Sequence, residues 1–481
     1  MSSDDGSGRN LEAGTARVLI TPPIGIRMMG YTVQECVSDA VERELTATAV
    51  VLSDGVTKVV LIACDLVFVQ SPLVDEIRGR IADKLGISAG NVLINCSHTH
   101  SGPMLPGWQP DSAEQQQLQE KYAVQLAEHL VDIAGQADKR REPARIGFGR
   151  GSAPIGINRR ERLPDGRVII GENPSGPVDY DVTVVRIDDL RGGTLATMIS
   201  AAAHTVVLGP KTSQLSPDYV GPAREIVESA TGAPCLFLLG AAGNVNPRCG
   251  IGAGGPEQYE DLERVGTLLG GEALTVWAKI RTHNRHGPRR IVQSVATVSV
   301  WDYEPAPEQG IEHFDVLSET VALPLGPLPT RDVAEGQLAD FRSQLQQAET
   351  SEAGLGRIHV LRKLVLWAET VLRAVEEGGA PLTRDLHFWA LRINNFGLVA
   401  LSGEPFAELA LEVKRLSPLE QTMFLGYSNG CVGYLPTSAA FDEGGMEVEE
   451  SYRNYLLPAP LTKAWEPAII ETALELLGRL N

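Results

Sequence analysis

The stretch KVVLIACDLVFVQSPLVDEIRGRIADKLGISAGNVLINCSHTH (58–100) decides the fold. Two apolar runs in it, 58–69 and 91–98, are rich in β-branched residues and predict strands buried on both faces of a sheet. The segment between them, 71–86, has apolar residues at helical spacing and stops at a glycine. This β-α-β order indicates an α/β fold.

The same alternation continues along the rest of the chain. Helices are predicted at 112–137, 217–232 and 260–280, and strands joined by turns at 144–200. Further along, the pattern predicts one half-exposed strand at 291–301, an irregular proline-rich loop at 303–330, and two helices at 331–379 that are broken at Gly354–Gly356. We expect layered mixed sheets with helices outside, in one large compact domain at 16–481 that carries the helical insertion 331–379 and follows a disordered tail at 1–15.

Composition restricts the classes of partner. The chain has 42 basic and 61 acidic residues and a formal net charge of −19. Such a surface repels nucleic acid and anionic lipid, so we expect a small-molecule substrate, with a homo-oligomer left open. No apolar run approaches the ~20 residues of a membrane span, and the polar N-terminus has no signal-like apolar region, so we expect a cytoplasmic protein. Six scattered cysteines without a CxxC pair argue against a cysteine zinc site or a disulfide framework.

Several predicted strands end in polar residues that are costly to bury. The strand 91–96 runs into Ser97-His98-Thr99-His100, the strand ending near 203 into His204, and the strand ending near 402 into Glu404. Because ligand sites of α/β sheets lie beyond the carboxyl ends of strands, these side chains could converge. Two histidines and one glutamate form a familiar catalytic zinc set that leaves one coordination position open.

Each of these signals, taken singly, has a second interpretation. The two histidines of the HxH pair could be satisfied by backbone groups. His204 could be an ordinary core histidine, and Glu404 could be an acidic residue in the first turn of a helix. Sequence spacing does not show that the four side chains meet.

Seven short motifs, in order, resemble the neutral, non-lysosomal ceramidases, a family of zinc amidases. The central one is SHTHSGP (97–103), and the resemblance extends over about 16–455. The others are ITPPIGIRMMGYT (20–32), IGINRR (155–160), ISAAAHT (199–205), GAAGNVNPR (240–248), LSGE (401–404) and SNGCVGYLPT (428–437).

The resemblance implies a role for particular residues of this chain. It implies a neutral-ceramidase-like catalytic domain whose Zn²⁺ is bound by His98, His204, Glu404 and Tyr434. It also implies that His100 and Arg159 contact the substrate or the developing oxyanion, with His100 as the proton carrier.

The sequence also departs from the family pattern. The family's serine nucleophile is replaced by Asn246, and the aspartate of the same loop by Asn244. A substrate-contacting tyrosine falls on Met446, and Tyr452 lies nearby to take its place. An amide cannot act as a nucleophile, so we expect Asn244 or Asn246 to assist Arg159 at the oxyanion instead. Since the sequence runs to Asn481, we expect neither a counterpart of the family's C-terminal immunoglobulin-like domain nor a secretion signal, and on this expectation ceramide is not the substrate.

These observations lead to one expected function and three alternatives. We expect a zinc-dependent amidohydrolase that cleaves an amide (C–N) bond of a small soluble substrate by means of a metal-activated water, as in small-molecule metabolism of a bacterial type. A zinc-dependent lyase or cyclase, an ester or lactone hydrolase, and a non-catalytic binding homologue are the alternatives. The pattern does not identify the substrate.

Overall fold

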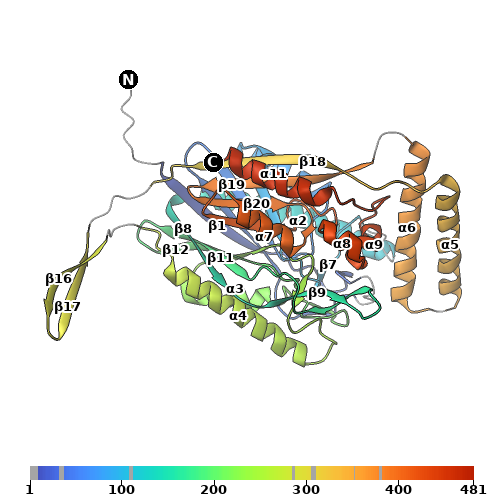
Figure 1. Cartoon of the computed structure of the whole chain (residues 1–481), viewed down its shortest axis with the longest axis horizontal. Helices are drawn as coiled ribbons and strands as arrows, with labels where there is room; N and C mark the ends of the chain where they lie inside the picture. Colours follow the sequence, from blue (N-terminus) through green and yellow to red (C-terminus); the bar gives the residue numbers. More distant parts are fainter. Residues whose placement is uncertain are drawn as a thin grey trace, which may run out of the picture.

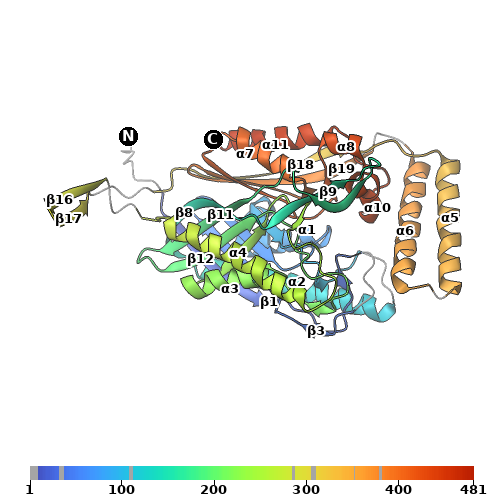
Figure 2. The same cartoon turned by 60° about the horizontal axis from the view of Figure 1, so that its bottom comes forward.

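A computed structural model of the chain describes residues 9–31, 37–107, 112–283, 288–304, 310–351, 353–378 and 382–481. Two sheets lie face to face at its centre, and helices cover their outer faces (Figures 1 and 2). This four-layer arrangement gives each apolar strand a buried environment on both sides. The expected α/β class with layered mixed sheets and outer helices is confirmed.

The larger sheet has eight strands in the order β14-β12-β11-β8-β1-β4-β5-β6. Its outer face is covered by α1 (Leu73–Leu85), α2 (Ala113–Lys139), α3 (Val220–Thr231) and α4 (Glu257–Lys279). The strands are β1 (Leu11–Leu19), β4 (Thr46–Ser53), β5 (Lys58–Cys64), β6 (Val92–Cys96), β8 (Glu142–Ser152), β11 (Asp181–Asp189), β12 (Thr194–Ala201) and β14 (Cys235–Leu239).

The smaller sheet has four strands in the order β18-β19-β20-β22. One face packs on the larger sheet through a shared apolar cluster that includes Leu61, Leu236, Trp389 and Leu398. The other face is covered by α7 (Ala407–Leu416) and α11 (Trp465–Arg479). The strands are β18 (Phe314–Pro324), β19 (Thr383–Ile393), β20 (Phe396–Leu401) and β22 (Gln421–Leu425).

The predicted insertion contains two helices, α5 (Arg331–Thr350) and α6 (Leu355–Glu377), which stand beside the body in both views (Figures 1 and 2). The break between them falls at Gly354, which directly precedes α6, as the sequence predicts. Trp367 fixes α6 to the body: it packs on Tyr452 and Leu456, and its indole N–H donates to the carbonyl of Leu457 at 2.8 Å.

Three expectations about segment structure are wrong. The tail was expected to extend to residue 15, but β1 begins at Leu11, because Leu11 and Ala13 are buried between the sheets; residues 1–8 lie outside the described ranges. The segment 303–330 contains β18, an edge strand that pairs with β19 and buries Phe314 and Leu323. The single strand expected at 291–301 is a hairpin, in which Val295 pairs with Val298 across a two-residue turn.

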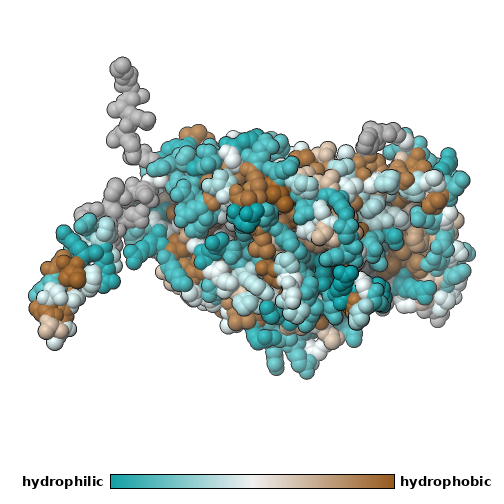
Figure 3. Space-filling view, in the orientation of Figure 1, coloured by the Kyte–Doolittle hydropathy of each residue, from teal (hydrophilic) through white to brown (hydrophobic). Residues whose placement is uncertain are grey.

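The hairpin consists of β16 (Arg289–Val295) and β17 (Val298–Tyr303) and exposes apolar side chains such as Ile291, Val292 and Trp301 (Figure 3). Among the described residues, no helix is both long and apolar enough to cross a membrane.

Candidate metal centre

The carboxyl ends of several parallel strands meet between the two sheets. β5 and β6, β12 and β14, and β20 and β22 are parallel neighbours. Asn95 on β6 joins their ends: its amide donates to the carbonyl of Gly426 at 2.8 Å, and its Oδ1 accepts from the N–H of Leu239 at 2.8 Å. Because the ends of β6, β14 and β22 are tied together, polar residues that follow the strands come close to one another.

Three predicted ligands meet at this point. His98 follows β6, His204 follows β12, and Glu404 begins β21 (Glu404–Pro405) just after β20. Oε2 of Glu404 lies 3.3 Å from Nε2 of His98 and 3.4 Å from Nε2 of His204. All three side chains are at most 2% exposed. The structure therefore brings together side chains that are more than a hundred residues apart in sequence.

The backbone fixes which nitrogen of each imidazole faces the centre. Nδ1 of His98 donates to the carbonyl of Val67 at 3.0 Å, and Nδ1 of His204 donates to the carbonyl of Ala242 at 2.6 Å. Both Nε2 atoms therefore present a lone pair toward Glu404. His98 has a left-handed backbone with φ of 61°, a strained conformation for a residue with a side chain, of a kind that is concentrated at functional sites.

The surroundings of the centre shift the pKa values of Glu404 and His204. Burial alone would raise the pKa of Glu404, but His98 and His204 beside it lower that pKa well below its usual value. Burial, assisted by the nearby positive charge of Arg159, lowers the pKa of His204 to about 4. Both shifts favour the unprotonated forms of Glu404 and His204, which are the forms that bind a metal ion.

This donor set fits a divalent metal ion. Oε2 of Glu404 is buried and accepts no hydrogen bond from the described residues, which is costly for a carboxylate oxygen unless a cation lies beside it. Ligand atoms about 2.0–2.1 Å from a tetrahedral zinc ion lie about 3.3–3.4 Å from one another. The two Nε2–Oε2 distances match that spacing.

The imidazole of His100 lies next to that of His98, and it belongs to the same group of three histidines as His98 and His204. Its Nε2 is 3.2 Å from Nε2 of His98, and nitrogen atoms of His98, His100 and His204 lie within 4.8 Å of one another. The His100 ring is farther from His204 than the His98 ring is, at 5.8 Å against 4.9 Å between centroids. Burial lowers the pKa of His100 well below its usual value, with the neighbouring histidines adding to the effect.

The MGY segment shapes the wall next to His100. Gly30 has φ of 134°, and a Cβ there would lie 2.5 Å from Cβ of His100, so no other residue fits this position without displacement. Tyr31 packs edge-on against the His100 ring at 4.8 Å, and its hydroxyl donates to the carbonyl of Leu208 at 2.9 Å. Both residues belong to a recognised motif, but the sequence assigned neither of them a role.

Arg159 reaches the centre from β9 (Gly156–Arg162), where the backbone is paired with β15 (Val245–Pro247). Its Nε donates to Glu447 at 3.0 Å, and its Nη1 lies 3.4 Å from both Nε2 of His204 and Oδ1 of Asn246. The Nη2 group is buried and meets no hydrogen-bond acceptor among the described residues. A buried cation with a spare donor is suited to binding a developing negative charge.

Two tyrosines lie beside Glu404: the sequence predicted Tyr434 as a site residue but did not predict Tyr455. β21 pairs with β23 (Tyr434–Leu435), which aligns Glu404 with Tyr434. The Tyr434 ring lies under the guanidinium of Arg159 at 5.2 Å, and burial raises the pKa of its hydroxyl. The hydroxyl of Tyr455 donates to Oε1 of Glu404. The sequence did not indicate Tyr455, because it directly follows the four-residue helix α10 (Ser451–Asn454), which no periodicity can locate.

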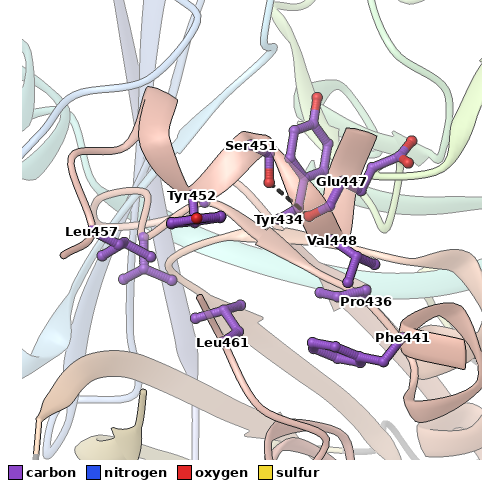
Figure 4. Close-up of a pocket in the computed structure, with 11 residues that line it drawn as sticks. Tyr434, Pro436, Phe441, Glu447, Val448, Ser451, Tyr452, Leu457 and Leu461 are labelled. Atoms are coloured by element: carbon purple, nitrogen blue, oxygen red, sulfur yellow. Dashed lines mark hydrogen bonds between the residues drawn. The ribbon is translucent and has the colours of Figure 1, made fainter. Parts of the chain in front are cut away.

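Two expected site residues have other contacts. Asn244 was expected at the oxyanion, but Oδ1 of Asn244 accepts from the N–H of Ala407 and its amide donates to Glu408 at 2.8 Å, so it holds the start of α7. Tyr452 was expected to contact the substrate, but it packs on Trp367 and lines a separate small cavity with Leu457 and Leu461 (Figure 4).

A cavity of about 590 Å³ opens above the centre, a size typical of sites for small molecules. The predicted residues His98, His100, Arg159, His204, Asn246, Glu404, Tyr434 and Met446 all line it. Residues of α6 between His359 and Leu366 form part of the wall, so the helical insertion shapes the cavity. No described residue of 303–330 lies in the lining.

Comparison with known proteins agrees with this geometry. Residues 12–235 match the family model described as "Neutral/alkaline non-lysosomal ceramidase, N-terminal". This part of the chain, just under half of it, is similar to the neutral/alkaline non-lysosomal ceramidase family. The similarity supports an amide hydrolase, and the histidine cluster is where such an enzyme could hold a metal ion.

Solved structures of ceramidases share the fold of the whole described chain. The neutral ceramidase from Pseudomonas aeruginosa is 18% identical, with 98% of this chain and 75% of that chain covered and a TM-score of 0.66. A ceramidase complexed with C2 is 16% identical, with the same coverage and a TM-score of 0.68. No curated protein matches the chain.

Proposed function

We propose that this protein is a zinc-dependent amidohydrolase that cleaves an amide bond of a small soluble substrate. The observation that carries the proposal is the meeting of two imidazole nitrogens with a buried carboxylate oxygen that accepts no hydrogen bond from the described residues, at a cavity of a ceramidase-family fold. Two nitrogens and one oxygen form a donor set that zinc accepts in catalytic sites.

Each residue at the centre has a proposed task. His98, His204 and Glu404 would hold the ion, with Tyr434 as a fourth ligand on the same pair of short strands. When bound, zinc polarises a carbonyl group and makes a water molecule acidic near neutral pH. Arg159, which faces the cavity with an unused Nη2 donor, would bind the carbonyl oxygen as it gains negative charge, and Asn246 would lie beside it.

The nucleophile in this proposal is water. None of the described residues that line the cavity is a serine, threonine or cysteine, so no described side chain there suits an acyl-enzyme step. In the proposed reaction, the water oxygen bonds to the carbonyl carbon, the C–N bond breaks, and the leaving nitrogen takes up a proton. His100 stands next to His98 and would carry that proton.

Metal removal tests the proposal. Treatment with a chelator should abolish amide hydrolysis, and stoichiometric zinc should restore it. In water enriched in ¹⁸O, the carboxylate product should gain one labelled oxygen. A product formed without labelled oxygen would indicate elimination or cyclisation, and full activity in metal-free protein would disprove the proposal.

The hydroxyl of Tyr455 should matter for metal affinity. Y455F removes the donor to Oε1 of Glu404, and loss of such a hydrogen bond to a metal ligand lowers metal affinity about 10- to 100-fold. Competition with a chromophoric chelator measures the zinc dissociation constant. Y452F is the matched control, because Tyr452 is only three residues away but packs on Trp367. Equal zinc affinity in Y455F and Y452F would contradict the role of Tyr455.

A further inference from the structure

The charge of the cavity is opposite to the charge of the chain. Acidic residues outnumber basic ones by 61 to 42 in the whole sequence. Among the described residues that line the cavity, two are acidic, Glu404 and Glu450, and five are lysine or arginine: Arg27, Arg159, Arg362, Lys363 and Arg453. Since Glu404 and Arg159 belong to the proposed metal centre, the rest of the lining has four cations and one carboxylate.

The cations come from separate parts of the chain. Arg362 and Lys363 lie on α6, within the helical insertion. Arg27 lies just before β2 (Met28–Met29) and is only 7% exposed; its Nη2 is 2.6 Å from Nδ1 of His359 on α6. Arg453 lies on α10. Three parts of the chain, namely α6, the segment before β2 and α10, therefore contribute positive charge to the cavity.

Two of these cations are well suited to meet a ligand. Arg453 forms no ion pair with a carboxylate in the described part of the chain; its guanidinium stacks on Trp367 at 5.1 Å, which holds it in place. Lys363 is in a desolvated position, since burial lowers the pKa of its ammonium group to about 8. An anion beside this ammonium group would offset the cost of desolvation.

We propose that the substrate is an amide that carries a carboxylate, and that Lys363 with the neighbouring arginines binds this carboxylate while the amide lies at the metal centre. This inference rests on the proposed function. Apolar side chains such as Val67, Phe68, Met104 and Leu364 line the same cavity and would contact the hydrocarbon part of the substrate. Arg362 also pairs with Glu349 at 3.0 Å, so the proposal rests on the positive sign of the lining as a whole, to which a neutral amide offers no opposite charge.

Three probes of similar length test the proposal. N-Ethylhexanamide is neutral, N-hexanoylglycine carries a carboxylate on the amine side, and the monoethylamide of adipic acid carries one on the acyl side. Binding of each probe to the full chain is measured by calorimetry in the presence of a chelator, so that neither turnover nor a carboxylate–zinc contact contributes. Turnover of each probe is measured separately with zinc.

At least one of the two acids should bind about 10- to 100-fold more tightly than N-ethylhexanamide, as is typical for a charge-assisted hydrogen bond. K363M should remove most of this preference, with little effect on the neutral probe. R357M is the matched control, since Arg357 is exposed on the same helix and does not line the cavity.

The preference should also depend on pH. Lys363 is protonated below its pKa of about 8, so the advantage of the acid should fall as the pH rises from 7 to 9, and K363R should keep it constant. The other charged or titratable groups that line this wall are Arg27, Arg362, Arg453, His359 and Glu450.

The outcomes separate this inference from the proposed function. Equal binding of the acids and the neutral amide, or a preference that survives in K363M, would overturn the inference even if all three amides are hydrolysed. A preference that K363M abolishes supports the carboxylate site, even if zinc-loaded protein hydrolyses none of the probes and the proposed function fails.

Discussion

Replacement of His98 by alanine is expected to abolish zinc binding and to lower amide hydrolysis by about 10³-fold or more, since a catalytic metal contributes several kcal/mol to the transition state. Nε2 of His98 lies 3.3 Å from the buried carboxylate oxygen of Glu404, and the left-handed backbone of His98 holds the imidazole there. Elemental analysis and single-turnover kinetics measure the two effects.

Thermal unfolding gives a readout that does not depend on turnover. A ligand that binds only the folded state raises the melting temperature, so added zinc should stabilise the wild-type protein and leave H98A unchanged. H129A is the matched control, since His129 is half-buried on α2 and lies outside the cavity lining. A stoichiometric zinc content in H98A, with normal activity, would contradict the assignment of His98.

The direction of the strands explains why the position of the centre could be predicted from the sequence. Parallel strands end at one edge of a sheet, and His98, His204 and Glu404 each follow an apolar strand, so their convergence could be expected before the fold was known. Tyr434 was placed by resemblance, and the structure shows how it arrives: its short strand pairs directly with that of Glu404.

The errors have a different physical origin. Asn244 and Asn246 stand two residues apart, so both belong to the same motif, but only Asn246 faces the cavity; the side chain of Asn244 is used at the start of α7. Tyr452 and Tyr455 lie three residues apart around a single turn of helix, and the turn directs them to different neighbours, Trp367 and Glu404. Such choices depend on packing partners that are distant in sequence, which a pattern of residue types does not contain.

The second large effect concerns Arg159, whose packing partner the sequence did not indicate either. R159M should lower kcat for amide hydrolysis by about 10²- to 10³-fold, as the loss of one oxyanion donor does, with a smaller change in KM. The sequence placed Arg159 next to Arg160 but gave no sign of Glu447, which pairs with both: with Nε of Arg159 at 3.0 Å and with Nη1 of Arg160 at 2.9 Å.

That shared partner provides a sharp control. In R159M, Glu447 keeps its ion pair with Arg160, and in R160M it keeps the one with Arg159, so neither variant leaves a buried carboxylate alone. Arg160 does not line the cavity. Arg160 also bonds to Glu443 and to the carbonyl of Gly444, so R160M should lose at least as much thermal stability as R159M, while only R159M loses the rate of the chemical step. Equal loss of kcat in the two variants would show that Arg159 acts by supporting Glu447 and α9 (Met446–Glu449), and not by contacting the substrate.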